Sequence, residues 1–331
     1  MKRPKDTDYL FISTRLRCLE TRLLTRQRME QMLETRSNED AAKVLSECGY
    51  EGLEPLTSDA LEHALAKARE DTFSELSELS PNPQIVDVFR LKYDYHNLKA
   101  IIKCTAAGSD PSGLFMDAGR VSVKTLTDLF TRGELSALPE ALAEAAQTAG
   151  DVLAATGDPQ RCDILLDRAY YQELTHLAED SRSSFLQEYV HLMIDAANLK
   201  SAVRAMRLDK DLEFLNTVLV EGGNVNVSTI AGAAVSGSGL EHVFSGWLES
   251  AAELGNQTAK GGRQTAFEKA CDDALNSFLQ SARMVPFGEA VLISYMAARE
   301  NEITAARIIL SGRLAGVPAE SIRERLREAY V

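Results

Sequence analysis

The sequence lacks three features that mark large protein classes: long apolar runs, glycine-rich phosphate loops and paired cysteines. A membrane-spanning helix needs roughly 18 or more apolar residues, and even the patch from Val291 to Ala298 is far shorter. No Gly-Lys pair occurs, so a P-loop is excluded. The wide spacing of the cysteines excludes a disulfide framework or zinc-finger pattern and favours reduced, cytosolic thiols; they are Cys18, Cys48, Cys104, Cys162 and Cys271.

Catalytic signatures are also missing. The five histidines include no pair at helical metal-binding spacing and no His-Glu-x-x-His. No Gly-x-Ser-x-Gly nucleophile turn is present. Glu300 and Glu302 are two residues apart, which directs them to different sides of a helix and prevents paired acid–base work. The sequence therefore predicts no catalytic, cofactor-binding or metal-binding residue, although an all-α enzyme with an unrecognised site stays open as a third hypothesis.

Basic residues are fewer than acidic ones, with 36 lysines and arginines against 49 aspartates and glutamates. The formal net charge is −13 and the sequence pI is about 5.0, so the chain as a whole repels nucleic-acid phosphate. One segment, from Arg15 to Arg28, is rich in arginine, but Glu20 lies within it and Glu30 and Glu34 follow it closely. We interpret this segment as a helix that faces solvent or a protein partner rather than nucleic acid.

What the chain does contain is helical periodicity. Ile12, Leu16, Leu19 and Leu23 follow steps of four, three and four residues, which places them on one face of a helix. Proline is sparse, at 9 residues, while alanine, leucine and glutamate are abundant. The pattern predicts an all-α fold.

An internal repeat is the most informative feature of the sequence. Two segments about a hundred residues apart read Asp-x-x-Asn-Leu-Lys, and each lies in a run of apolar residues spaced for a helix with a narrow buried seam. In each copy the leucine is expected in the core, and the asparagine is expected to bond a neighbouring helix end. The motif residues are Asp94, Asn97, Leu98 and Lys99 in the first copy, and Asp195, Asn198, Leu199 and Lys200 in the second.

A third, degenerate copy is expected near residues 291–310. The Asp-x-x-Asn-Leu-Lys signature is absent there, and Glu302 and Ile303 stand where Asn-Leu would fall. Loop-forming residues near 113 and 222 separate the copies. The sequence therefore predicts three similar helical domains, at residues 1–113, 114–221 and 222–331, arranged around a pseudo-threefold axis.

The repeat, its order and its spacing resemble the family of central-stalk C subunits of V/A-type ATPases and V-type ATP synthases, whose eukaryotic member is the d subunit of the V-ATPase. The resemblance covers nearly the whole chain, from the arginine-rich segment through both motifs to Glu300–Ile303 and Arg307. It implies a funnel-shaped, all-α, non-catalytic component of the central stalk, on the cytoplasmic face of a membrane. It also implies a socket that links the shaft, made by the D and F proteins, to the membrane rotor ring of K or c proteins and transmits torque.

The basic residues of the repeat are the candidate partner-binding residues. Lys99 and Lys200 occupy the same place in their copies, off the apolar seam, and Arg307 or Thr304 stands near that place in the third. Long basic side chains there could reach an acidic shaft or ring loop while their stems pack. The alternative is a soluble helical adaptor or scaffold unrelated to the motor.

Overall fold

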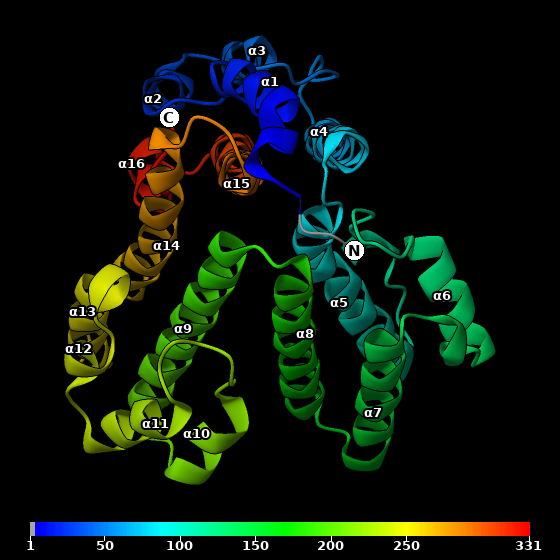
Figure 1. Ribbon diagram of the computed structural model, residues 1–331, viewed down its shortest axis with the longest axis vertical. Coiled ribbons are helices and arrows are strands. Elements are labelled where there is room, and N and C mark those ends of the chain that lie inside the picture. The colour runs from blue at the N-terminus through cyan, green and yellow to red at the C-terminus, as the bar shows by residue number, and fades with distance from the viewer. Residues whose placement is uncertain (1–3) are drawn as a thin grey trace.

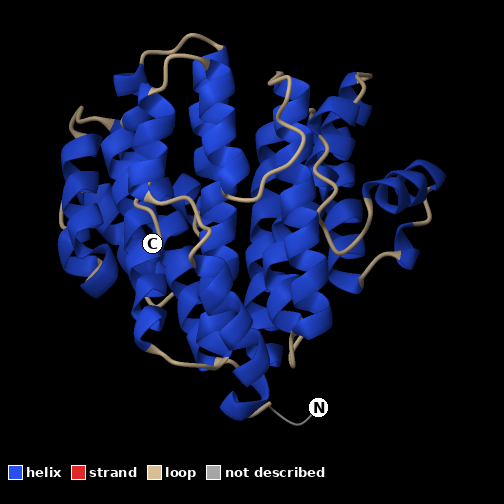
Figure 2. Cartoon of the chain, turned by 90° about the horizontal axis from the view of Figure 1, so that it is seen from above, coloured by secondary structure: helices blue, strands red, loops and turns tan. Residues whose placement is uncertain are grey.

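The computed structural model describes residues 4–331, and within that range it contains helices, turns and loops but no strand. Figure 2 shows the same all-helical composition. The predicted all-α class is confirmed. None of the helices in residues 4–331 is long and apolar enough to cross a membrane.

The three longest helices organise the molecule, and each packs mainly against the helices that follow it or, for the last, against the start of the chain. They are α5 (Gln84–Ala107), α9 (Ser184–Arg207) and α15 (Glu289–Leu314). The buried seam predicted for the first two is confirmed, since Leu98 and Leu199 are completely buried. The expected third copy corresponds to α15, where Ile303 is equally buried.

The first group of helices surrounds α5 and lies on the right of Figure 1. Helices α7 and α8 cover most of α5, and the short α6 contacts it from the side. Besides α5 the group comprises η2 (Ser112–Leu114), α6 (Val123–Arg132), η3 (Leu135–Ala137), α7 (Glu140–Thr156) and α8 (Pro159–Ser181).

The second group surrounds α9 and fills the lower and left parts of Figure 1. Helices α11, α13 and α14 pack on α9, and α10 lies at its C-terminal end. The further members are α10 (Leu212–Val218), α11 (Val227–Ser236), α12 (Leu240–Val243), η4 (Gly246–Leu248), α13 (Glu249–Ala259), α14 (Gln264–Gln280) and η5 (Ser281–Met284).

The third group combines residues from both parts of the chain around α15, at the top of Figure 1. The second half of α15 and the N-terminal helices share a separate apolar cluster that includes Met32, Leu45, Leu61 and Leu310. Besides α15, the third group comprises η1 (Asp6–Tyr9), α1 (Leu10–Glu20), α2 (Arg26–Glu34), α3 (Asn38–Glu47), α4 (Ser58–Leu79) and α16 (Ala319–Arg323).

A side chain caps at least one short helix in each of the three groups. Thr25, Ser122 and Asn226 accept a hydrogen bond from the first turn of α2, α6 and α11, respectively. These residues satisfy backbone N–H groups that have no partner inside the helix. A serine, threonine or asparagine just before an apolar-periodic run is the sequence signal for such a cap.

The cysteines are distributed over all three groups and form no disulfide. Cys18 is exposed, whereas Cys48, Cys104, Cys162 and Cys271 are buried. Burial raises the pKa of the Cys48 and Cys162 thiols, and it raises the pKa of Cys271 to about 12. Cys48, Cys162 and Cys271 are therefore protonated packing residues near neutral pH.

Candidate functional site

The two repeat asparagines fasten the loops that lead to α6 and α11. Asn97 donates through Nδ2 to the carbonyl oxygen of Met116 at 2.8 Å and accepts from the Met116 amide at 2.9 Å. Asn198 makes the same pair of bonds with Val220, at 2.7 and 2.9 Å. The partners are loop residues, not the helix ends expected from the sequence. One buried side chain thus satisfies both backbone groups of one loop residue.

The repeat aspartates hold the next stretch of the same loops. The Val121 amide donates to Asp94 at 3.0 Å, and the Asn224 and Val225 amides donate to Asp195 at 3.0 and 3.1 Å. Val121 and Val225 directly precede the caps of α6 and α11. Asp-x-x-Asn is therefore a loop clamp: the asparagine fixes the start of the loop and the aspartate fixes the entry to the next helix.

The clamp has a second requirement that the motif alone did not predict. A β-carbon added at Gly119 would overlap Asp94 Oδ1, and one added at Gly223 would overlap Asp195 Oδ1. Both glycines lie in the clamped loops and allow the backbone to approach the carboxylate. The signal in the sequence was a glycine two residues before Val121 and Val225 in both copies.

The third group has a clamp of different composition. Glu302 accepts from the Leu24 amide and the Tyr50 hydroxyl, each at 2.7 Å, and forms an ion pair with Arg299. Leu24 directly precedes Thr25, the cap of α2. Glu302 precedes the buried Ile303 as each repeat asparagine precedes its leucine, but its carboxylate accepts from a loop amide as Asp94 and Asp195 do.

Burial sets the electrostatics of the clamps. It raises the pKa of both Asp94 and Asp195, against the opposing effect of the hydrogen bonds that they accept. Arg120 neutralises the first clamp by pairing with Asp94 at 2.8 Å and with Glu173 at 2.7 Å. Tyr95 donates to the same Glu173 at 2.8 Å. A closed network of this kind rigidifies structure and leaves no acid–base pair open to a substrate.

The three candidate partner-binding residues make similar contacts. Each joins its long helix to the last long neighbour in its group: Lys99 to Asp167 on α8, Lys200 to Asp272 on α14, and Arg307 to Glu62 on α4, at 2.5, 2.6 and 2.8 Å. Their side chains are 25%, 32% and 31% exposed. The basic groups thus have an internal role, and their contact with a partner stays a prediction.

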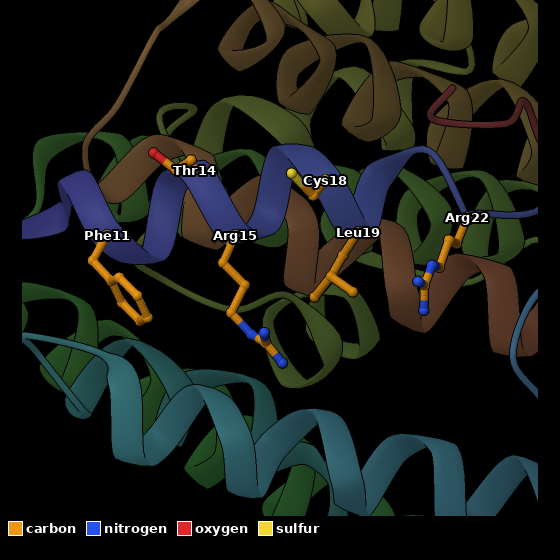
Figure 3. Close-up of a pocket in the computed structure, with 6 residues that line it drawn as sticks. All are labelled: Phe11, Thr14, Arg15, Cys18, Leu19 and Arg22. Atoms are coloured by element: carbon orange, nitrogen blue, oxygen red, sulfur yellow. The ribbon is translucent and has the colours of Figure 1, made fainter.

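The arginines of the N-terminal segment have two kinds of environment: some bond the backbone of other elements, and others lie at the surface. Arg17 donates to the carbonyl oxygens of Ala282 and Val285, at 2.8 and 2.6 Å, and so ties α1 to the region around η5. Figure 3 shows Phe11, Arg15 and Leu19 on one side of α1 and Arg22 in the turn that follows it, along a pocket of about 410 Å³. Arg15 pairs with Glu75 of α4. The expectation of a solvent-facing helix holds for this side of α1 and not for Arg17.

No metal-binding group of three or more His, Cys, Asp or Glu residues is found within residues 4–331. The recurring elements are instead structural, a clamp and an ion pair in each helix group. Comparison with known proteins identifies the family to which the chain belongs. The sequence profile of the ATP synthase (C/AC39) subunit family matches residues 12–325. The chain belongs to this family.

Individual members of the family align along nearly the whole chain. The C subunit of the V-type sodium ATPase of Enterococcus hirae is 25% identical over 329 residues, which cover 98% of this chain and 99% of the relative. The C subunit of the A-type ATP synthase of Methanocaldococcus jannaschii is 24% identical over 350 residues, covering 96% and 86%, respectively. The family resemblance drawn from the repeat is confirmed.

Proposed function

We propose that this chain is a non-catalytic rotor component of the central stalk of a V/A-type ATPase or ATP synthase. The observation that carries the proposal is the end-to-end match to the C subunits of V-type and A-type enzymes. The closed polar networks of the clamps support a mechanical role, because their carboxylates are occupied by backbone amides and arginines. The chain transmits torque between ATP chemistry and ion movement that take place in other chains.

Its partners in this proposal are the D and F shaft proteins on one side and the K or c proteins of the membrane ring on the other. The chain works as a socket, on the cytoplasmic face of the membrane, without a span of its own. Three helical domains around a pseudo-threefold axis would supply a funnel that receives the shaft. The threefold recurrence of the clamp and of the ion pair on the long helix supports this symmetry.

The domain limits at residues 113 and 221 are part of the same proposal. Residue 113 lies in η2, which follows α5, and residue 221 lies in the loop that follows α10, within the first and second helix groups. Packing offers a second division, just before each long helix. Limited proteolysis followed by mass spectrometry distinguishes the two divisions by where the first stable fragments begin.

The decisive test is purification of the tagged full-length chain from native membranes. Ring and shaft proteins should co-purify in fixed ratio, and the isolated chain should show no saturable nucleotide binding by calorimetry. Purification without ring or shaft proteins would favour a helical adaptor unrelated to the motor. Micromolar ATP binding by the isolated chain would contradict the non-catalytic role.

The candidate partner-binding residues Lys99, Lys200 and Arg307 need a test that separates partner contact from the internal ion pairs. Lys99→Glu with Lys200→Glu reverses two charges and breaks two internal pairs. In contrast, Lys99→Glu with Asp167→Lys exchanges the two ends of one pair and keeps its attraction. Arg307→Glu with Glu62→Arg does the same in the third group.

If the basic groups serve a partner, both exchanged variants should fold normally and hold the complex less firmly, with the loss reduced at high salt. Coupling is read as the fraction of ATP hydrolysis that a ring inhibitor stops in the reconstituted complex. Full inhibitor sensitivity in the exchanged variants would assign these residues to the internal pairs alone.

A further inference from the structure

A groove between the first and second helix groups is separate from the clamps. It has a volume of about 700 Å³ and is walled by α5 and α8 on one side and by α9, α10 and the turn between them on the other. This volume lies within the range of roughly 300–1,000 Å³ that is typical of ligand pockets. The groove is therefore large enough to hold several side chains of a partner.

The charge of the groove is opposite to that of the chain. Five basic and two acidic side chains line it, a net charge of +3, whereas the whole chain carries −13. The acidic residues are Asp163 and Asp167, and both are already paired, with Lys103 at 3.0 Å and Lys99 at 2.5 Å. Its remaining positive charge attracts an anionic group.

Several donors in the groove have no hydrogen-bond or ion-pair acceptor among residues 4–331. Arg204 is exposed on α9, and the Ser201 hydroxyl lies one turn earlier on the same helix. Lys210 is exposed, and its ammonium lies 5.3 Å from the centre of the Phe214 ring. Arg168, by comparison, is used internally, because it donates to the carbonyl oxygens of Asn216 and Leu219 at the end of α10.

Tyr171 adds a neutral donor to the opposite wall. Burial and, to a smaller extent, the nearby charge of Asp167 raise the pKa of Tyr171 to about 12, so its hydroxyl stays protonated at physiological pH. Its ring is held by an edge-on contact with Tyr170, 4.8 Å between centroids. The donors thus come from both helix groups and face a common space.

We propose that this groove binds an acidic, partly apolar segment of another protein, with Arg204 and Lys210 as its principal charge partners. The proposal rests on the function proposed above, so that the segment belongs to another chain of the rotary complex. Carboxylates of the segment would accept hydrogen bonds from Arg204, Lys210 and Ser201.

The lining favours a protein segment over a small phosphate compound. Leu208 is 58% exposed at the end of α9, and Ile164, Phe214 and Val218 also face the groove. Apolar side chains between basic ones suit a segment that alternates acidic and apolar residues. A phosphate site would instead gather its cations around one point, whereas these are spread over several elements.

Photocrosslinking in the assembled complex tests the proposal. Leu208 is replaced by benzoylphenylalanine in the full-length chain, and the crosslinked peptide is identified by mass spectrometry. The expected product is a net-acidic segment of another chain of the complex. The matched control is the same replacement at Val235, which is 55% exposed on α11 and does not line the groove; it should not capture that segment.

Charge reversal provides the second readout. Arg204→Glu with Lys210→Glu should reduce the Leu208 crosslink by about tenfold or more. Lys124→Glu with Lys260→Glu changes the net charge equally at exposed positions outside the groove, and it should leave the crosslink unchanged. Equal loss in both variants would reduce the effect to overall charge and overturn the proposal.

The other outcomes are also decisive. Capture of a neutral or basic segment, of a nucleotide or of phospholipid would overturn the assignment to an acidic protein segment, as would the absence of any crosslink in an intact complex. Failure of the unmodified chain to co-purify with ring and shaft would instead contradict the proposed function. The two failures are therefore distinguishable.

Discussion

The third helix group differs from the first two in how it reaches the same geometry. In the first two groups an aspartate and a glycine meet in a continuous stretch of chain. In the third, a longer glutamate reaches Leu24 from the opposite part of the sequence, and Tyr50 and Arg299 complete the contact. The comparison teaches that the frame preserves the place of a buried carboxylate rather than the residue that provides it.

The loop contact that the repeat asparagines make in the first two groups is made by other residues in the third. Backbone groups of the segment that follows α16 are hydrogen-bonded by α14, in the second group. Asn276 and Gln280 of α14 donate to the carbonyl oxygens of Glu328 and Ala329, at 3.3 and 3.1 Å. Asp273 accepts from the Glu328 amide at 2.9 Å. The segment after α16 is thus fastened from the neighbouring group, whereas the first two groups fasten the corresponding loops themselves.

The largest expected effect concerns the long helices. Leu199→Asp and Ile303→Asp each place a carboxylate at a completely buried position, and each should lower the free energy of unfolding by more than about 4 kcal/mol or prevent folding. Denaturant titration followed by circular dichroism measures the loss. Val235→Asp, at an exposed site, is the control. An unchanged stability for Ile303→Asp alone would break the equivalence of α15 with α9.

The next effect concerns the asparagine. Asn198→Ala leaves the amide and carbonyl of Val220 without partners in a buried site, so the free energy of unfolding should fall by about 2–4 kcal/mol. Gln280→Ala removes a single bond from the third group and should cost about 1 kcal/mol. Exposed Asn216→Ala is the control, with a change within about 0.5 kcal/mol. Equal losses for Asn198→Ala and Gln280→Ala would contradict the contrast between the groups.

The glycines should show a somewhat smaller effect. Gly119→Ala and Gly223→Ala push a methyl group against Asp94 and Asp195, at a cost of about 1–3 kcal/mol. Gly150→Ala, inside α7 with no atom near the added carbon, should instead stabilise the protein by about 0.5–1 kcal/mol. Thermal unfolding of the three variants tests both signs. Stabilisation by Gly223→Ala would show that the loop does not need its close approach to Asp195.

The smallest effect is a difference in pH dependence between a clamp and the buried ion pair of Glu300. Burial tends to raise the pKa of Glu300, but Lys92 and Arg69 outweigh it and lower the pKa. Its contribution to stability is thus present above the unfolded pKa and lost as the pH falls. Asp195 has a raised pKa, so its contribution is present at acid pH and lost as the pH rises through that pKa.

Unfolding titrations at several pH values between 7 and about 4 test the difference in sign. The destabilisation caused by Glu300→Gln should shrink as the pH falls through this range. The destabilisation caused by Asp195→Asn should grow. Parallel pH profiles for the two variants would show that one of the two directions is misassigned.

The all-α class, the buried seams and the family could be predicted because they depend on local periodicity and on a repeat within the chain. The third clamp could not, because Glu302 has a longer side chain and meets residues from the opposite part of the chain. The ion pairs of Lys99, Lys200 and Arg307 were missed for a related reason. Their acidic partners lie on other helices, and helical periodicity carries no information about which helices become neighbours.

The distribution of cysteines gives each helix group a buried thiol whose labelling rate measures how often that group opens. Cys104 and Cys162 report on the first group, Cys271 on the second and Cys48 on the third. Exposed Cys18 reacts without any opening and serves as the reference for the labelling rate. A maleimide pulse under native conditions modifies a shielded thiol only when its surroundings open. The labelling rate of each cysteine, read by mass spectrometry, therefore ranks the three groups by how often they come apart, without any change to the sequence.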